Sequence, residues 1–247
     1  MNKSSEWMPT CERFVVYLDI MGFKDIVFRH THEEVLDIME QFRLPIKKIK
    51  KDAYQRLQGN INNSGLFNNT VIRPVIFSDS VILFSSDNSL ASIENMIWQV
   101  TFILSHALRK GIPIKGAIAY GEQTADIIKS LYFGRPLIDA WELQEEIIIY
   151  GVVFHHTVEK YLVENGLIQE LLNKKSVIQY ATPLKEGIIK HYLVNWLKLT
   201  ETNFPKQAAD LKVAIPNIYC NVSGSPRRYV DNTIDFMNYG NNKRKNK

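Results

Sequence analysis

Apolar and polar residues follow two different periods along this chain, and the period changes at regular places. Residues 14–18 are five consecutive apolar side chains, most of them aromatic or β-branched, and the segment 13–19 is therefore typical of a buried strand. From Thr31, an N-cap residue, apolar residues recur at helical spacing as far as Ile49, and we expect a bend or break near Pro45. A strand followed by an amphipathic helix therefore opens the fold.

The middle of the chain continues with shorter elements. Residues 72–77 and 81–85 are two β runs around Ser78-Asp79-Ser80, the pattern of a tight hairpin. Residues 90–108 return to helical spacing, and residues 114–121 alternate as a further strand. The predicted order is βαββαβ, the ferredoxin-like α+β motif.

Beyond this unit the pattern is weaker, and the Asn- and Gly-rich stretch 59–70 predicts a surface loop. We divide the chain into an N-terminal arm (1–12), an α+β domain (13–198) and a C-terminal helical extension with a basic tail (199–247). The remaining predicted elements are strands at 131–133, 152–154 and 188–197 and helices at 136–146, 156–172, 199–211 and 229–237.

Composition excludes several classes of protein. The 247 residues are 45% apolar, which is enough for a core, and much of the net charge of +4 comes from the tail 243–247, so a nucleic-acid partner is not expected. Cys11 and Cys220 do not form a disulfide framework, and no stretch has the roughly 20 apolar residues of a membrane span. The first residues lack the apolar run of a signal peptide, so we expect a cytoplasmic protein without membrane contact.

Two aspartates stand where strongly apolar β runs end. Asp19 closes the first predicted strand and Asp79 lies at the tip of the hairpin. Each alone has an ordinary interpretation, as a helix cap or a turn residue. In a ferredoxin-like sheet, however, these two places are neighbours, and two carboxylates without a His or Cys cluster favour a hard cation such as Mg²⁺ or Mn²⁺.

Four segments of the chain are similar to segments of a known family: residues 18–23, 77–81, 114–121 and 133–144. In this order they resemble the catalytic domain of class III adenylate and guanylate cyclases. The resemblance is closer to the bacterial Pycsar cyclases, which make cyclic pyrimidine nucleotides in antiphage defence. The domain over 13–198 would then be a class III cyclase catalytic domain.

The resemblance implies a two-metal phosphoryl transfer. Asp19, Asp79 and the backbone carbonyl of Ile20 would hold two Mn²⁺ or Mg²⁺ ions. The ribose 3′-hydroxyl of UTP or CTP would attack the α-phosphorus, which gives cyclic UMP or cyclic CMP and pyrophosphate. The residues expected to meet the phosphates are the turn Met21, Gly22 and Phe23, then Lys115 as first basic candidate, with Arg73 and Arg135 behind it.

Other positions depart from the purine cyclases. Those enzymes carry an Asn and an Arg where this chain has Ile138 and Glu142, and Val75 stands at a base-contacting position. None of these three side chains can make the contact that purine cyclases make at its position, which favours a pyrimidine substrate. Lys115 has an alternative interpretation as a solvated surface residue.

Assembly and partners also follow from the resemblance. Class III sites form between two domains, so a homodimer is expected, with the aspartates of one subunit facing the region of Lys115 and Arg135 of the other. A separate effector protein would sense the product. Two alternatives stay open: a purine (adenylate or guanylate) cyclase, and an inactive ferredoxin-like module that binds nucleotides or RNA.

Overall fold

The computed structural model describes residues 7–57, 70–219 and 222–242, and the predicted loop at 59–70 and the basic tail lie almost wholly outside this part. The elements are β1 (Thr10–Ile20), α1 (Phe23–Arg29), α2 (His32–Leu57), β2 (Ile72–Phe77), β3 (Ser80–Ser85), α3 (Leu90–Arg109), β4 (Ile114–Asp126), β5 (Leu131–Gly134), α4 (Arg135–Glu146), β6 (Val152–Phe154), α5 (His156–Glu164), α6 (Ile168–Asn173), β7 (Val177–Leu184), β8 (Gly187–Val194), α7 (Trp196–Asn203), α8 (Pro205–Tyr219) and α9 (Ser225–Asn242).

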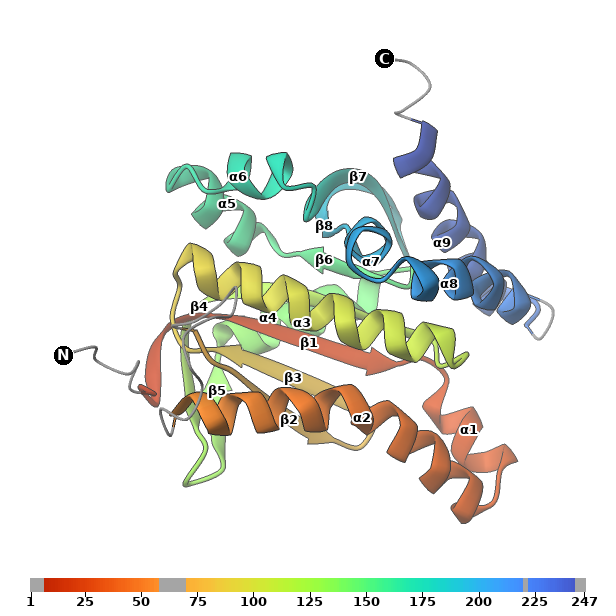
Figure 1. The fold of residues 1–247 in the computed structure, drawn as a ribbon, viewed down its shortest axis with the longest axis horizontal. Coiled ribbons are helices and arrows are strands. Elements are labelled where there is room, and N and C mark those ends of the chain that lie inside the picture. Colours follow the sequence, from red (N-terminus) through yellow and green to blue (C-terminus); the bar gives the residue numbers. More distant parts are fainter. Residues whose placement is uncertain (1–6, 58–69, 220–221, 243–247) are drawn as a thin grey trace.

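One sheet runs through the molecule, with strand order β2-β3-β1-β4-β6-β8-β7 and β5 paired to the far half of β4 (Figure 1). The first four strands are antiparallel neighbours, and α1–α2 and α3 connect them in the predicted βαββαβ order. The predicted ferredoxin-like α+β fold is therefore confirmed. Strand β6 then joins β4 in parallel, and the β7–β8 hairpin extends that side of the sheet.

The two faces of the sheet are covered by different helices. Alternate residues of β1, from Phe14 to Ile20, are fully buried in the main core together with apolar residues of α2 and α3. The opposite face carries Val15 and Tyr17, and α4 packs there, behind the sheet in the view of Figure 1. Asp19 belongs to this second face, because side chains alternate along a strand.

The helix predicted from Thr31 begins as expected. The Glu34 amide N–H donates to the Thr31 hydroxyl oxygen at 3.3 Å, and the Glu34 carboxylate accepts the Thr31 amide N–H at 2.8 Å, which is a capping box. The helix continues through Pro45 instead of ending there. Phe42 and Ile46 on either side are fully buried, and this packing offsets the backbone hydrogen bond that proline removes.

Three predicted elements differ from the structure. The helix expected over 156–172 is divided into α5 and α6 at Gly166, whose φ of 69° is left-handed. The strand expected over 188–197 ends at Val194, because the chain turns at Asn195 and buries Trp196 in α7. Strand β7, before it, was not predicted.

At both ends of the described chain, regular structure and packing include more residues than the sequence predicted. Strand β1 begins at Thr10, inside the predicted arm, and the Trp7 indole N–H donates to the carbonyl of Ala125 at 2.9 Å. At the other end, α7, α8 and α9 replace two shorter predicted helices. None of the helices within 7–57, 70–219 and 222–242 combines the length and apolar character needed to cross a bilayer.

Candidate functional site

The structure brings Asp19 and Asp79 together at one end of the sheet. Asp19 is paired in register with Ser80, the first residue of β3, and the Ile20 amide N–H donates to the backbone carbonyl of Asp79 at 3.2 Å. Ser78, in the turn before Asp79, has a φ of 54°, which lets the chain reverse within the two residues between β2 and β3. The end of β1 and the hairpin tip therefore lie side by side, as the sequence predicted.

The surroundings of Asp19 disfavour its charge. The Ser80 hydroxyl donates to its Oδ1 at 3.2 Å, and the Tyr17 hydroxyl lies 2.7 Å from that of Ser80. Burial, and after it the negative charge of Asp79, raises the pKa of Asp19 to about 6, although the Ser80 hydrogen bond lowers it; Glu145 raises and Lys115 lowers the pKa by less. A cation bound at this place would reduce the repulsion between Asp19 and the neighbouring carboxylates.

The donor set fits a hard divalent cation. It consists of carboxylate oxygens, and the Asp19 carboxylate has no ion-pair partner among the described residues. No group of three or more His, Cys, Asp or Glu in the described part is arranged to hold a metal. Mg²⁺ and similar ions commonly use one or two protein carboxylates and complete their shell with water and substrate phosphates. The pair is therefore suited to an ion that arrives with a nucleotide.

The turn after β1 is partly engaged in backbone bonds. The Met21 amide N–H donates to the carbonyl of Pro113 at 2.8 Å, so it is occupied in this structure. Gly22 has a left-handed φ of 72° and precedes α1 without a side-chain cap, and a Cβ there would meet open space. The expectation of phosphate contacts at Met21, Gly22 and Phe23 thus narrows to the amides of Gly22 and Phe23. Ile20, whose backbone carbonyl is the third predicted metal ligand, is the last residue of β1 and is paired with Ile114 of β4.

Lys115 lies beside Asp19 of its own chain. The two residues are paired in register on the adjacent strands β4 and β1. The expectation that Lys115 of one subunit faces Asp19 of the other is therefore wrong. Lys115 is only 3% exposed, so its interpretation as a solvated surface residue is wrong. Burial lowers the pKa of Lys115 to about 8, although Glu145 acts in the opposite direction.

Arg73 and Arg135 are not brought to the aspartates within one chain. Arg73 pairs with Phe84, four residues along β3 from Ser80, which is about 13 Å at strand spacing, and its guanidinium carbon lies 4.8 Å from the Trp7 ring centroid. Arg135 begins α4, whereas the other end of that helix meets Lys115. Its side chain is 84% exposed, and its Nε lies 3.6 Å from Oδ1 of Asp139.

Sequence reasoning missed three residues that surround the carboxylates: Ser80, Tyr17 and Glu145. Ser80 and Tyr17 could have been found by applying the strand alternation, which places Tyr17 and Asp19 on one face and Ser80 opposite Asp19. Glu145 comes from the last turn of α4, and its proximity depends on how that helix crosses the sheet. No local pattern carries that information.

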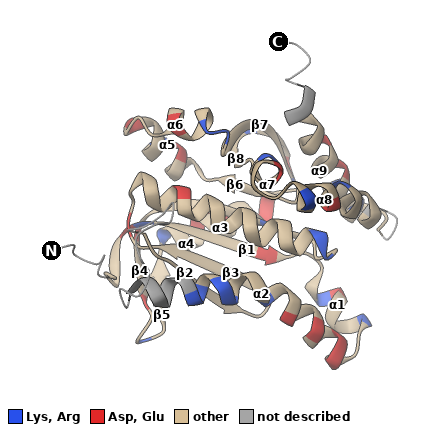
Figure 2. Ribbon diagram, viewed as in Figure 1, with Lys and Arg blue, Asp and Glu red and all other residues tan. Residues whose placement is uncertain are grey.

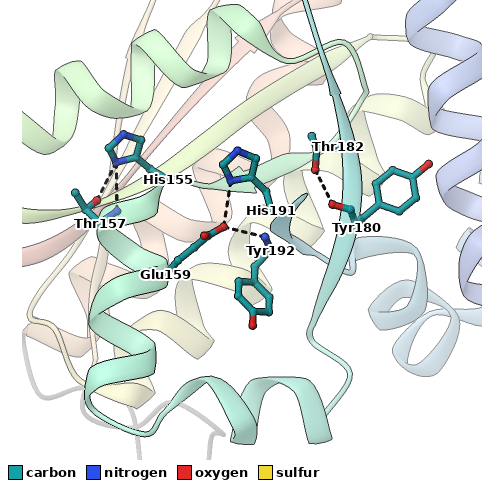
Figure 3. Close-up of polar contacts among 7 residues, drawn as sticks. All are labelled: His155, Thr157, Glu159, Tyr180, Thr182, His191 and Tyr192. Atoms are coloured by element: carbon teal, nitrogen blue, oxygen red, sulfur yellow. Dashed lines mark hydrogen bonds and ion pairs between the residues drawn. The ribbon is translucent and has the colours of Figure 1, made fainter. Parts of the chain in front are cut away.

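Two of the histidines, His155 and His191, lie at the start of α5 and on β8 (Figure 3). His191 Nδ1 lies 3.1 Å from the Glu159 carboxylate, which also accepts the Tyr192 amide N–H at 3.0 Å. His155 Nδ1 lies 3.0 Å from the Thr157 hydroxyl oxygen, at the start of α5. The contacts of Glu159 with His191 and Tyr192 join α5 to β8, whereas His155 caps the start of α5.

The outer face of α4 is exposed and partly apolar. Ile138 and Trp141 are 56% and 47% exposed, and Glu142 lies on the same face. Phe77, at the end of β2, is 78% exposed on the side of the sheet that α4 occupies. Along α2 the charges separate by sign, with acidic residues in the first turns and basic residues in the turns that follow (Figure 2).

No family model matches the chain, and no curated protein sequence matches it. Solved structures do. The catalytic core of a rhodopsin-guanylyl cyclase with converted specificity, in complex with ATPαS, has a TM-score of 0.51 and 12% identity over 76% of this chain and 98% of that chain.

Two further solved structures are similar to lesser degrees. The guanylate cyclase domain of RhGC from Catenaria anguillulae, in complex with GTP, has a TM-score of 0.49 and 13% identity over 74% of this chain and 95% of that chain. A bacterial light-regulated adenylyl cyclase has a TM-score of 0.47 and 14% identity over 81% of this chain and 98% of that chain. At this identity the match with the rhodopsin-guanylyl cyclase core shows the fold, which is that of a class III cyclase catalytic domain.

Proposed function

We propose that this protein is a nucleotide cyclase that converts UTP to 3′,5′-cyclic UMP, or CTP to cyclic CMP, with release of pyrophosphate. The observation that carries the proposal is the convergence of Asp19 and Asp79 at one end of a class III cyclase fold. The raised pKa of Asp19, caused by burial and by Asp79, is consistent with a pair that functions together with a cation.

In this proposal the chain's own residues position the reaction. Asp19 and Asp79, with the carbonyl of Ile20, would hold two Mn²⁺ or Mg²⁺ ions, which would lower the pKa of the ribose 3′-hydroxyl and neutralise charge on the leaving group. The 3′-hydroxyl would lose its proton to solvent and its oxygen would bond to the α-phosphorus, while the bond from the α-phosphorus to the bridging oxygen of the leaving pyrophosphate would break. The amides of Gly22 and Phe23 accommodate the phosphates at the start of α1.

The outer face of α4 lacks the Asn and Arg that purine cyclases carry there, which supports a pyrimidine substrate. Ile138 and Glu142 stand where purine cyclases carry Asn and Arg, and both are exposed on this face. Ile138 has no hydrogen-bonding group and Glu142 is acidic, so neither can stabilise the charge on a phosphate. Val75, at a base-contacting position of purine cyclases, cannot bond to a base edge either.

A homodimer would complete the site. The exposed apolar residues Ile138, Trp141 and Phe77 lie on the face of the sheet that carries the aspartates, which supports burial of this face against a second copy. Arg135 of one subunit could then approach the phosphates held by the other. We further propose that the catalytic unit covers 13–198 and that the product signals to a separate effector in the cytoplasm, in antiphage defence.

Purine cyclisation is the second candidate, because the similar solved structures are adenylyl and guanylyl cyclases. The test is to incubate the purified protein with each of the four ribonucleoside triphosphates and Mn²⁺ and to separate the products. We expect cyclic UMP or cyclic CMP. Cyclic AMP or cyclic GMP as the main product would contradict the pyrimidine assignment, and no consumption of any triphosphate would favour an inactive binding module.

Matched variants connect the assay to the site. Asp79→Asn is expected to lower turnover about 10²–10³-fold, the loss seen when a central electrostatic group is removed from an active site. Asp25→Asn, on the exposed side of α1, removes an equal charge a few residues from the site and should leave turnover unchanged.

A further inference from the structure

The amino group of Lys115 is held by the end of helix α4. Its Nζ donates to the backbone carbonyls of Ile147 at 3.1 Å and Glu145 at 3.3 Å. These carbonyls lie at the C-terminus of the helix, where the negative end of the helix dipole favours a cation. Two of the three ammonium donors of Lys115 are thereby used.

Helix α9 covers the remaining side of this ammonium group. The Tyr229 ring centroid lies 5.6 Å from Nζ, within the range of a cation–π contact. The helix is fixed there by Asn232, which donates to the carbonyl of Ile148 at 2.6 Å, and by Thr233, whose hydroxyl accepts the Tyr150 amide N–H at 2.9 Å. The segment between α4 and β6 is thus bonded to Lys115 on one side and to α9 on the other.

Lys115 nevertheless stands directly opposite Asp19 on the neighbouring strand. Side chains paired in this way have Cβ atoms about 5 Å apart and point to the same face, so a lysine can reach a carboxylate across the pair. Here no ion pair joins Lys115 to any described carboxylate, because its amino group is bonded to the carbonyls instead. The Asp19 carboxylate is left to Ser80 and to the neighbouring Asp79.

We propose that helix α9 keeps the carboxylate pair open to divalent cations by holding the Lys115 ammonium group against the end of α4. Lys115 is a positioning residue in this account, not a phosphate ligand. When the Tyr229 ring is lost, the ammonium group is less firmly held, turns to Asp19 and competes with the metal as an internal cation. The C-terminal extension thereby acts on the metal site without touching it.

This inference rests on the proposed metal role of Asp19 and Asp79, and metal binding tests the two separately. The probe is Mn²⁺ alone, titrated calorimetrically at pH 7.5 into the full-length protein. We expect the wild-type chain to bind Mn²⁺ and Tyr229→Leu to bind it at least about five-fold more weakly, the lower end of typical couplings between sites. Tyr229→Phe keeps the ring and should match the wild type.

The double variant separates competition from mere loss of structure. Adding Lys115→Met to Tyr229→Leu removes the competing cation, so the affinity for Mn²⁺ should return to the wild-type value or exceed it. Asn232→Ala loses only the contact with Ile148 and should shift the affinity in the same direction as Tyr229→Leu by a smaller factor. It serves as the second test of α9 if Tyr229→Leu does not fold, as judged by circular dichroism.

The outcomes against the inference are distinct. Wild-type protein that binds no Mn²⁺ would overturn the proposed metal site and this inference with it. Wild-type binding that is unchanged in Tyr229→Leu, or in Asn232→Ala where that variant replaces it, would overturn the role of α9 alone. Weakened binding that Lys115→Met does not restore would show that α9 acts through general stability and not through the lysine.

Discussion

At the scale of single residues, the carboxylate pair is a place where the fold accepts an unfavourable charge. Asp19 is bonded to Ser80 and lies near Asp79, and its charge is only partly compensated. Native structures usually pair such groups, which supports the proposed role of the pair in binding a cation. Lys115 is the basic residue paired with Asp19 on the neighbouring strand, but its amino group donates to backbone carbonyls at the end of α4 instead.

The raised pKa of Asp19 gives a stability prediction for the metal-free protein. Because burial and Asp79 raise the folded-state pKa to about 6, above the unfolded value of about 4, the folded chain binds the proton more tightly. Ionisation of Asp19 therefore lowers the unfolding free energy as the pH rises through this window. Asp19→Asn should be more stable than wild type at pH 8 by about 1 kcal/mol, a value reduced for partial solvation, and by about half as much at pH 5, which lies in the middle of this window.

Urea denaturation with EDTA at both pH values measures this difference. Asp25→Asn, at an exposed position, is the control and should show no pH-dependent gain. An Asp19→Asn effect of the same size at pH 5 and pH 8 would contradict the electrostatic account, because it would then not depend on ionisation.

At the scale of elements, the site depends on close contact between β1 and β4. Gly116 lies opposite Leu18, next to the pair of Asp19 and Lys115. A Cβ at Gly116 would come within 2.3 Å of the Tyr17 carbonyl oxygen, a contact between backbones that a side-chain rotation cannot relieve. The strand can be this closely packed only because the residue is glycine.

Gly116→Ala should therefore destabilise the fold by about 1–3 kcal/mol or more, as for overpacked core sites, and should displace Asp19. The matched control is Gly111→Ala, where a Cβ meets open space and only the left-handed φ of 73° is unfavourable. Thermal unfolding of both variants checks this, and equal stability of Gly116→Ala and wild type would show that β1 and β4 are less tightly packed than described.

The elements also show how far the sequence could lead. Apolar periodicity was strong enough to predict β1, the β2–β3 hairpin, α3 and the convergence of Asp19 with Asp79, because these depend on local patterns and on one known motif. Strand β7 could not be predicted in the same way, because its burial is mixed and its partner β8 supplies the register. The division at Gly166 depends on a single left-handed residue within an otherwise helical pattern.

The contacts of Lys115 and Arg73 were beyond prediction for another reason. Lys115 is buried by the end of α4 and by Tyr229, which lies more than a hundred residues later in the chain. Arg73 faces Trp7 because it lies near the start of β2, at the end of the strand away from the hairpin tip, so its position depends on its place along the strand and not on its charge. Long-range packing decides such cases, and a single sequence contains no local signal for it.

At the scale of the whole molecule, the exposed face of α4 carries the assembly prediction. Trp141→Glu places a charge among exposed apolar residues that a second copy would cover. We expect this variant to be monomeric by light scattering and to lose turnover, while each chain still binds Mn²⁺. Ile188→Glu, at a 71% exposed position on β8, is the matched control and should stay dimeric. A dimer that survives Trp141→Glu would place the interface elsewhere.

The central claim is that Asp19 and Asp79 jointly hold divalent metal under a nucleoside triphosphate. The most direct measurement is an anomalous difference map at the manganese edge, from crystals grown with Mn²⁺ and a non-hydrolysable UTP analogue. The account predicts manganese peaks within about 2.1 Å of oxygens from both carboxylates, a usual distance for a hard divalent ion with oxygen ligands. Manganese bound elsewhere, or carboxylates that share no ion, would contradict it.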